Sequence, residues 1–252
     1  MTFKIKKIST PKIKSPILIE GLPGMGNVGK IVVDYMIENL HAKKFYEIYS
    51  HRFPNSVFVN EENLIELPKI ELYYKNIKNQ SFIFLSGDIQ PIEETSCYEF
   101  CEIVLDIFEK FKGKEIITVG GIGMPEQPLH PKVFSTANNK EIIKKYKNKN
   151  VNSQLYGIVG PIIGVSGLLL GLSKERKIPA ISFLAETFGH PAYLGVKGAK
   201  EILKNLNQDL KLNLNLKILD KEIEEIEKEQ NPEKIKKYKP KFIDGSHLNY
   251  IG

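Results

Sequence analysis

The sequence predicts an α/β fold, a three-layer sandwich in which a mostly parallel sheet lies between helices. Short apolar runs that end in glycine alternate with longer segments of helical periodicity. Strands separated by helices pair in parallel through right-handed crossovers, which place helices on both faces of the sheet. The chain has 252 residues, 42% of them hydrophobic and 26% charged, enough for one large domain or two small ones.

In the first half of the chain, apolar runs and two-residue alternation predict strands, and a 3.6-residue period predicts helices. The expected strands are 16–20, 44–49, 65–74 and 81–86, and the expected helices are 28–40 and 93–111. Pro68 interrupts the third strand, because proline cannot donate to a strand ladder. Glu93 and Glu94 favour a helix start, since acidic groups stabilise the positive end of the helix dipole.

The second half continues the alternation. The expected strands are 115–119, 133–137 and 178–184, and the expected helices are 140–146, the apolar end of 160–172, 196–210 and 218–229. The last helix is strongly charged with one apolar stripe, which fits either a solvated surface helix or a subunit contact. We expect residues 1–229 to form one α/β domain with its C-terminal helices. Residues 230–252 are expected to form a lysine-rich linker and an apolar tail.

Composition argues against several classes of function. The net charge is +6, but only Arg52 and Arg176 are arginines, and the lysines are spread among glutamates without a basic stripe. We therefore expect no nucleic-acid partner. The longest apolar run, 156–172, is broken by glycines and a proline, and no apolar leader follows the charged start. The expectation is a cytoplasmic protein without a membrane segment.

The two cysteines, Cys97 and Cys101, lie four residues apart in a predicted helix and would share one face. A redox or metal pair is one interpretation, but neither a second pair nor a histidine cluster completes a four-ligand site. We therefore predict two buried thiols on a core-facing helix and no metal centre.

A glycine-rich segment follows the first predicted buried strand and matches the dinucleotide-binding pattern through Gly24, Gly26 and Gly29. In that pattern the glycines let a pyrophosphate approach the backbone and a helix N-terminus. The pattern also needs an acidic residue about 20 positions later to hold a ribose. The nearest candidate, Glu47, lies inside a predicted strand.

The same segment contains the front of a phosphate-binding P-loop, from Gly24 to Gly29 and Lys30. The next residue is Ile31, where a P-loop carries a serine or threonine that reaches Mg²⁺. P-loop proteins also bind Mg²⁺ through an aspartate at the end of another strand. The candidate here, Asp88, follows its strand only after a glycine. Neither nucleotide motif is therefore complete.

Pro23 is required by neither motif, and it points to a family instead. The segment Gly21-Leu-Pro23-Gly24-Met-Gly26 resembles the Gly-x-Pro-x-x-Gly loop of the PAC2 family of proteasome-assembly chaperones. The resemblance runs in order from about residue 17 to 210. It includes 86–91 with Asp88, the glycine loop 120–125 with Gly120, Gly121 and Gly123, and the segments 160–170, 184–187 with Glu186, and 189–191.

This resemblance implies an α/β/α sandwich related in shape to nucleoside phosphorylases, which acts by binding and needs no cofactor. Archaeal members resemble the eukaryotic chaperones that hold proteasome α-subunits during ring assembly. The implied partners are proteasome α-subunits or a related assembly, bound by a homo-oligomer from trimer to pentamer.

Several such chaperones end in a hydrophobic residue, a tyrosine and any last residue. Here the chain ends Tyr250-Ile251-Gly252, so the tyrosine is third from the end. Leu248, Tyr250 and Ile251 can still anchor a partner, because aromatic and aliphatic groups dominate interface hot spots. The alternative is a tail that folds back on its own domain or a neighbouring subunit.

An enzyme would need a nucleophile or base, and the candidates are Asp88, His130, Ser166, Glu186 and His190. They form no known constellation, and Ser166 lacks the Gly-x-Ser-x-Gly elbow of hydrolases. Glu186 is expected at a strand end, either as a cap or at a subunit contact. The sequence thus predicts a non-enzymatic protein, with a small-molecule enzyme or nucleotide binder of phosphorylase-like or dinucleotide-binding type as the alternative.

Overall fold

A computed structural model of the protein describes residues 2–157, 160–217, 219–220 and 223. Residues Met1–Leu214 form one compact unit and Asn215–Gly252 a second. In the second unit, residues 216, 217, 219, 220 and 223 are helical. Most of the helix predicted at 218–229, the linker and the tail with Leu248, Tyr250, Ile251 and Gly252 lie outside the described residues. The predicted division at residue 229 stays a prediction.

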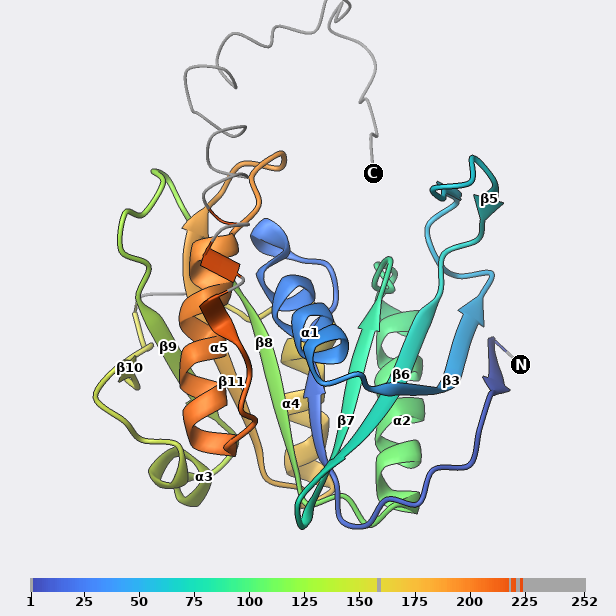
Figure 1. Ribbon diagram of the computed structural model, residues 1–252, viewed down its shortest axis with the longest axis horizontal. Helices are drawn as coiled ribbons and strands as arrows, with labels where there is room; N and C mark the ends of the chain where they lie inside the picture. Colours follow the sequence, from blue (N-terminus) through green and yellow to red (C-terminus); the bar gives the residue numbers. More distant parts are fainter. Residues whose placement is uncertain (1, 158–159, 218, 221–222, 224–252) are drawn as a thin grey trace, which may run out of the picture. The chain divides into compact units, whose positions relative to one another are not determined.

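A large sheet runs through the first unit (Figure 1). Its strand order in the described residues is β1-β3-β6-β7-β2-β8-β11-β9-β10. The bounds are β1 Phe3–Lys7, β2 Ile17–Glu20, β3 Lys43–Ser50, β6 Ile70–Ile77, β7 Gln80–Gly87, β8 Glu115–Met124, β9 Val133–Ala137, β10 Val151–Asn152 and β11 Ala180–Phe188. Two further strands, β4 Phe58–Val59 and β5 Ile65–Glu66, form a separate hairpin.

The centre of the sheet is parallel, as predicted, through β7, β2, β8 and β11. Outside this centre, parallel pairing is found among the described strands only between β9 and β10. On one side β1, β3, β6 and β7 pair antiparallel, and on the other β11 pairs antiparallel with β9. The reason is visible between β6 and β7, where two residues join the strands, because a parallel connection needs a crossover of about a dozen residues or more.

Helices cover both faces of the sheet (Figure 1), which confirms the predicted α/β sandwich. Helices α1 and α5 pack on one face, and α2 and α4 on the other. The bounds are α1 Val28–Asn39, α2 Glu94–Lys110, α3 Lys140–Lys145, α4 Val165–Glu175 and α5 Val196–Leu210, with a short 3-10 helix, η1, at Met25–Asn27. None of the described helices is both long and apolar enough to cross a bilayer.

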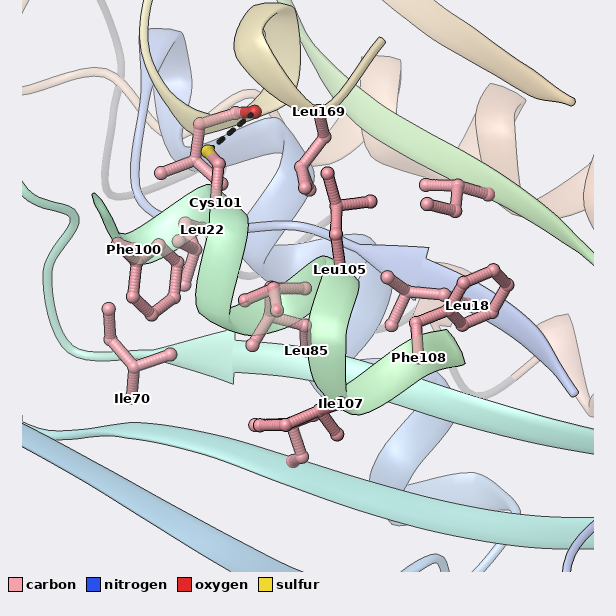
Figure 2. Close-up of a cluster of buried hydrophobic side chains, with 14 of the residues drawn as sticks. Leu18, Leu22, Ile70, Leu85, Phe100, Cys101, Leu105, Ile107, Phe108 and Leu169 are labelled. Carbon is pink, nitrogen blue, oxygen red and sulfur yellow. Dashed lines mark hydrogen bonds between the residues drawn. The ribbon is translucent and has the colours of Figure 1, made fainter. Parts of the chain in front are cut away.

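A large apolar core lies between the sheet and the α2–α4 layer (Figure 2). Phe100, Leu105 and Phe108 of α2 pack in it with Leu18 of β2 and Leu169 of α4. Full burial of each such side chain contributes about 1.5 to 3 kcal/mol to folding.

Both cysteines lie in the same core, on the buried face of α2. Cys97 and Cys101 are free thiols, and Cys101 Sγ donates to the carbonyl oxygen of Val165 at 3.9 Å. The prediction of two buried thiols on a core-facing helix is confirmed.

Two strands, β8 and β11, extend well beyond their predicted C-terminal ends. Strand β8 continues to Met124, so Gly120, Gly121 and Gly123 lie in a strand and not in a loop. Strand β11 continues to Phe188, which places Glu186 inside the strand and not at its end. The two strands pair with each other along this whole stretch, and that pairing overrides the low strand propensity of glycine.

Candidate functional site

The residues that carry the motifs gather at one end of the sheet. This is the end at which the parallel strands β7, β2, β8 and β11 finish, where α/β sheets usually place ligands and partners. The segment after β2 holds Gly21, Pro23, Gly24 and Gly26, and Asp88 follows β7. The C-terminal halves of β8 and β11 hold Gly120, Gly121, Gly123 and Glu186.

Gly21 and Gly29 allow helix α1 to lie directly on the sheet. A Cβ atom on Gly29 would lie 2.3 Å from the carbonyl oxygen of Val119 in β8. A Cβ atom on Gly21 would lie 2.1 Å from the carbonyl oxygen of Gly29. Real Cβ atoms do not approach oxygen this closely, so any side chain here would push α1 away from β8. These two glycines are packing positions.

Gly26 and Gly121 hold η1 against the strand ends in the same way. Gly26 has φ +60, and its open side faces Thr187, whose Oγ1 would lie 2.5 Å from an added Cβ. A Cβ atom on Gly121 would lie 2.3 Å from the carbonyl oxygen of Met25. The amide of Gly195 donates to the carbonyl oxygen of Gly26 at 2.7 Å. The space beside these glycines is therefore filled by the chain's own atoms.

Gly24 differs from its neighbours. It is exposed, and the only atom near an added Cβ is the carbonyl oxygen of Leu22, at 4.0 Å. Its φ of −161 is extended backbone, which any residue adopts. The dinucleotide pattern thus combines a free position, Gly24, with two packing positions, Gly26 and Gly29.

A buried carboxyl group ties this loop to helix α4. Glu20 ends β2 and is 0% exposed. Its Oε1 accepts from the amide of Leu22 at 3.1 Å, and its Oε2 accepts from the Ser166 hydroxyl at 2.8 Å. Burial raises the pKa of Glu20 to about 7, although the two hydrogen bonds act in the opposite direction.

Gln90 makes a second link between the loop and α4. Its Nε2 donates to the carbonyl oxygen of Pro23 at 2.7 Å, and its Oε1 accepts from the amide of Val165 at 3.3 Å. Gly164, with φ +84, allows the backbone to lie close to the Gln90 side chain. A Cβ atom on Gly164 would lie 2.5 Å from Gln90 Oε1. The Pro23 loop is thus fixed to the start of α4 at two points.

Neither Glu20 nor Gln90 was singled out from the sequence. Glu20 ends an apolar run just before a glycine, a position at which a charged side chain is usually taken as exposed. One signal was available. Leu18 and Glu20 are two residues apart in a strand, and residues two apart share a face, so a buried Leu18 implies a carboxyl that points at the same core.

Asp88 and Glu186, the two carboxylates singled out in the sequence, each hydrogen-bond to the backbone of a lysine. Asp88 Oδ2 accepts from the amide of Lys69 at 3.1 Å, and the Asp88 amide donates to the Lys69 carbonyl at 3.0 Å. Glu186 Oε2 accepts from the amide of Lys132 at 2.9 Å, and the Glu186 amide donates to the Lys132 carbonyl at 3.0 Å. Each carboxylate caps the residue just before a neighbouring antiparallel strand, β6 or β9.

The enzyme candidates are not brought together. Asp88 follows β7 and Glu186 lies in β11, and these two strands are separated by β2 and β8, which places them roughly 14 Å apart at the usual strand spacing. His130 is exposed. His190 makes a turn, since its Nδ1 accepts from the amide of Ala192 at 3.2 Å. Within the described part of the chain, no three histidine, cysteine or acidic side chains gather in a group that could hold a metal ion.

A comparison with known proteins decides the family. The model of the PAC2 family matches residues 18–232, most of the chain. The chain belongs to the PAC2 family. The resemblance seen in the Pro23 loop and the later glycine segments is thereby confirmed, and the match spans the motif-bearing end of the sheet.

Among solved structures, PbaB of Pyrococcus furiosus, described as an archaeal proteasome activator, is 33% identical with a TM-score of 0.85. The match covers 94% of this chain and 100% of PbaB. PbaA of the same organism, described as an archaeal homolog of proteasome-assembly chaperone, is 24% identical with a TM-score of 0.76, and 92% of each chain is covered. At that identity the likeness shows the fold alone.

An uncharacterised protein of Methanocaldococcus jannaschii is also similar. It is 32% identical over 232 residues, which cover 90% of this chain and 90% of the relative.

Proposed function

We propose that this PAC2 protein is a non-enzymatic, chaperone-like protein that binds proteasome α-subunits or a related assembly. The observation that carries the proposal is its likeness to PbaB, 33% identical over nearly the whole of both chains and described as a proteasome activator. The geometry of the loops favours the non-enzymatic interpretation, because the motif residues are used in packing and capping. Gly21, Gly26 and Gly29 pack the chain's own atoms, and the carboxylates Asp88 and Glu186 cap strands.

Partner capture is proposed to use the last residues of the chain. Leu248, Tyr250 and Ile251 supply two aliphatic groups and one aromatic group, the kinds of side chain that fill pockets at interface hot spots. A homo-oligomer, from trimer to pentamer, would present several such tails at once. Several tails on one body bind a ring of similar subunits more tightly than one tail, because later contacts form at high effective concentration.

A small-molecule site is the second candidate. The observation in its favour is Gly24, which is exposed and unobstructed beside the strand ends where α/β sheets bind ligands. A nucleotide held there would approach the backbone of one glycine and not of three.

Removal of residues 248–252 tests the proposal. We expect the shortened chain to bind immobilised archaeal proteasome α-rings at least about tenfold more weakly than the full chain, which corresponds to the loss of about 1.4 kcal/mol or more. The substitution Tyr250→Ala should account for most of the loss. Tyr238→Ala, in the predicted linker, is the matched control and should bind as the full chain does. Unchanged binding after the deletion would contradict the tail as the anchor.

A further inference from the structure

A groove of about 1430 Å³ lies beside the free edge of the sheet, away from the glycine loops. One side is β1 and the other is the segment that follows β3, together with Leu67 and Pro68. Figure 1 shows β1 as the last strand of the sheet on the side that also carries the β4–β5 hairpin. The groove therefore runs along a strand edge that the rest of the described chain leaves open.

Strand β1 pairs with β3 alone among the described strands. The amide of Ile8 donates to the carbonyl oxygen of Phe45 at 2.9 Å, in register with the β1–β3 ladder. Bonded and non-bonded pairs alternate along an antiparallel ladder. The amide and carbonyl groups of Phe3, Ile5 and Lys7 consequently point away from β3, where an added strand would find them.

The walls of the groove expose large apolar side chains. Ile5 is 45% exposed, Val57 53% and Leu67 68%. Three such side chains around one hollow differ from single scattered apolar residues, which are normal on a protein surface. They can bury the alternate side chains of an extended segment.

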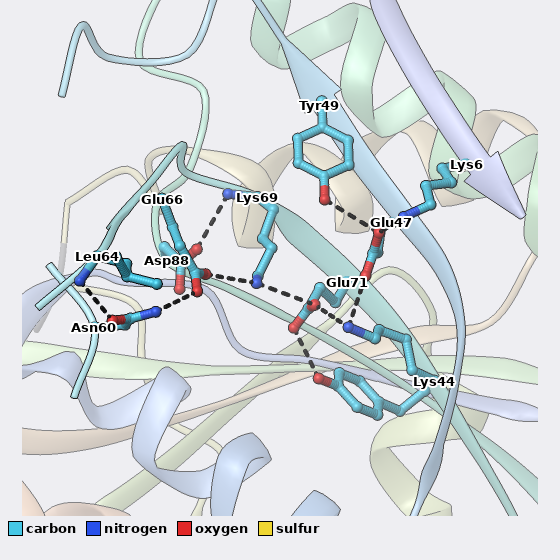
Figure 3. A network of polar contacts seen from close by, with 11 residues as sticks. Lys6, Lys44, Glu47, Tyr49, Asn60, Leu64, Glu66, Lys69, Glu71 and Asp88 are labelled. Atoms are coloured by element: carbon cyan, nitrogen blue, oxygen red, sulfur yellow. Dashed lines mark hydrogen bonds and ion pairs between the residues drawn. The ribbon is translucent and has the colours of Figure 1, made fainter. Parts of the chain in front are cut away.

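The charge of the groove has one sign. Lys4, Lys6, His51 and Arg52 line it, and none of the lining residues, all of them in the described chain, is acidic. Lys6 is paired with Glu47, which also accepts from the Tyr49 hydroxyl (Figure 3), and Arg52 is paired with Glu93. Lys4 has no ion-pair partner among the described residues.

Edge lysines have a simpler role, because charges at a free strand edge prevent sheets from joining edge to edge. That role explains Lys4 and Lys6. It does not explain why Ile5, Val57 and Leu67 surround a hollow at the same edge, since exposed apolar groups favour association.

We propose that this groove binds an extended segment of a partner protein in which acidic and aliphatic residues alternate. The segment adds a strand to β1 through the outward amide and carbonyl groups. Its aliphatic side chains pack on Ile5, Val57 and Leu67, and its carboxylates face Lys4 and the other cations of the groove. Added strands of this kind gain affinity from the main chain and selectivity from alternate side chains.

The probe is a fluorescein-labelled, acetylated peptide of alternating glutamate and valine, with anisotropy measured against the full chain. Two control peptides isolate the contacts. One replaces each glutamate with lysine, and the other carries N-methyl groups on alternate amides, which removes the strand hydrogen bonds. We expect both control peptides to bind at least about tenfold more weakly.

Two variants of the protein test the site itself. Ile5→Pro removes an outward amide and should leave the fold intact, because proline is tolerated at an edge strand when its nitrogen faces solvent. Lys4→Glu reverses the unpaired charge. Each should raise the Kd of the glutamate peptide about tenfold or more. Lys174→Glu, an exposed lysine on α4, is the matched control, and circular dichroism confirms folding.

Three results would overturn the proposal. The glutamate peptide does not bind, it binds no better than the lysine peptide, or it binds the Ile5→Pro and Lys4→Glu variants as well as the original chain. If the peptide fails and Ile5→Pro instead changes the oligomeric state in light scattering, the groove is an interface between copies of this chain. None of these results depends on binding to α-rings.

Discussion

Replacement of Gly29 by alanine is expected to lower the free energy of unfolding by about 3 kcal/mol, the upper range for overpacking of a close contact. The added Cβ would lie 2.3 Å from the carbonyl oxygen of Val119, a backbone atom in the middle of the sheet that cannot move aside. Helix α1 would have to shift away from β8. The usual gain of alanine over glycine in a helix, about 1 kcal/mol, is too small to offset this clash.

Gly24→Ala is the matched control, four residues before the start of α1. Its nearest contact is 4.0 Å away and its backbone is extended, so the change should stay within about 0.5 kcal/mol. Urea denaturation followed by circular dichroism measures both variants. Equal stability of the two variants would contradict the interpretation of this loop as a packing device.

Glu20→Gln is expected to stabilise the protein at alkaline pH and to remove much of the pH dependence of its stability. The pKa of Glu20 is raised from 4.5 to about 7 in the folded chain, because burial disfavours the charged carboxylate. Between these values the folded state holds a proton that the unfolded state has released. The free energy of unfolding therefore falls as pH rises, by about 3 kcal/mol in total, and the stability is complete only below about pH 4.5.

Glutamine keeps the hydrogen bonds of the neutral acid, with its oxygen toward Leu22 and its amide toward Ser166. The variant should match the original chain near pH 5 within about 1 kcal/mol and exceed it by about 2 to 3 kcal/mol near pH 8. Ser166→Ala should raise the pKa further, since the Ser166 hydroxyl lowers it. Glu175→Gln, an exposed carboxylate on α4, is the control. Parallel pH profiles for Glu20→Gln and the original chain would contradict this assignment.

Local patterns predicted the helices and the central strands well. Helix α5 has its predicted bounds, and α2 differs by one residue at each end, because apolar periodicity and flanking glycines mark both. Strand β1 was not predicted, since its burial pattern has one buried residue followed by four exposed ones. Only the pairing of β1 with β3, more than 30 residues away in sequence, makes it a strand.

The candidate site was predicted less completely. The glycine positions and Pro23 could be found from their spacing, which is a local property. Their role could not, because the atoms that fill the space beside them belong to Val119 and Thr187, far away in the sequence. The same holds for Glu20, whose partner Ser166 is 146 residues away. Packing partners brought together by topology leave no local pattern.

The most direct test of the central proposal is the binding of the intact chain to archaeal proteasome α-rings, measured by analytical ultracentrifugation. Melting temperatures with ATP, NAD and a phosphorylated nucleoside are recorded beside it. We expect a saturable complex with the α-rings and no rise in melting temperature, because a ligand that binds only the folded state would stabilise it, by about 2.7 kcal/mol at a hundred times its Kd. A chain that forms no complex with the rings, but melts at a higher temperature with one of the nucleotides, would contradict the proposed function.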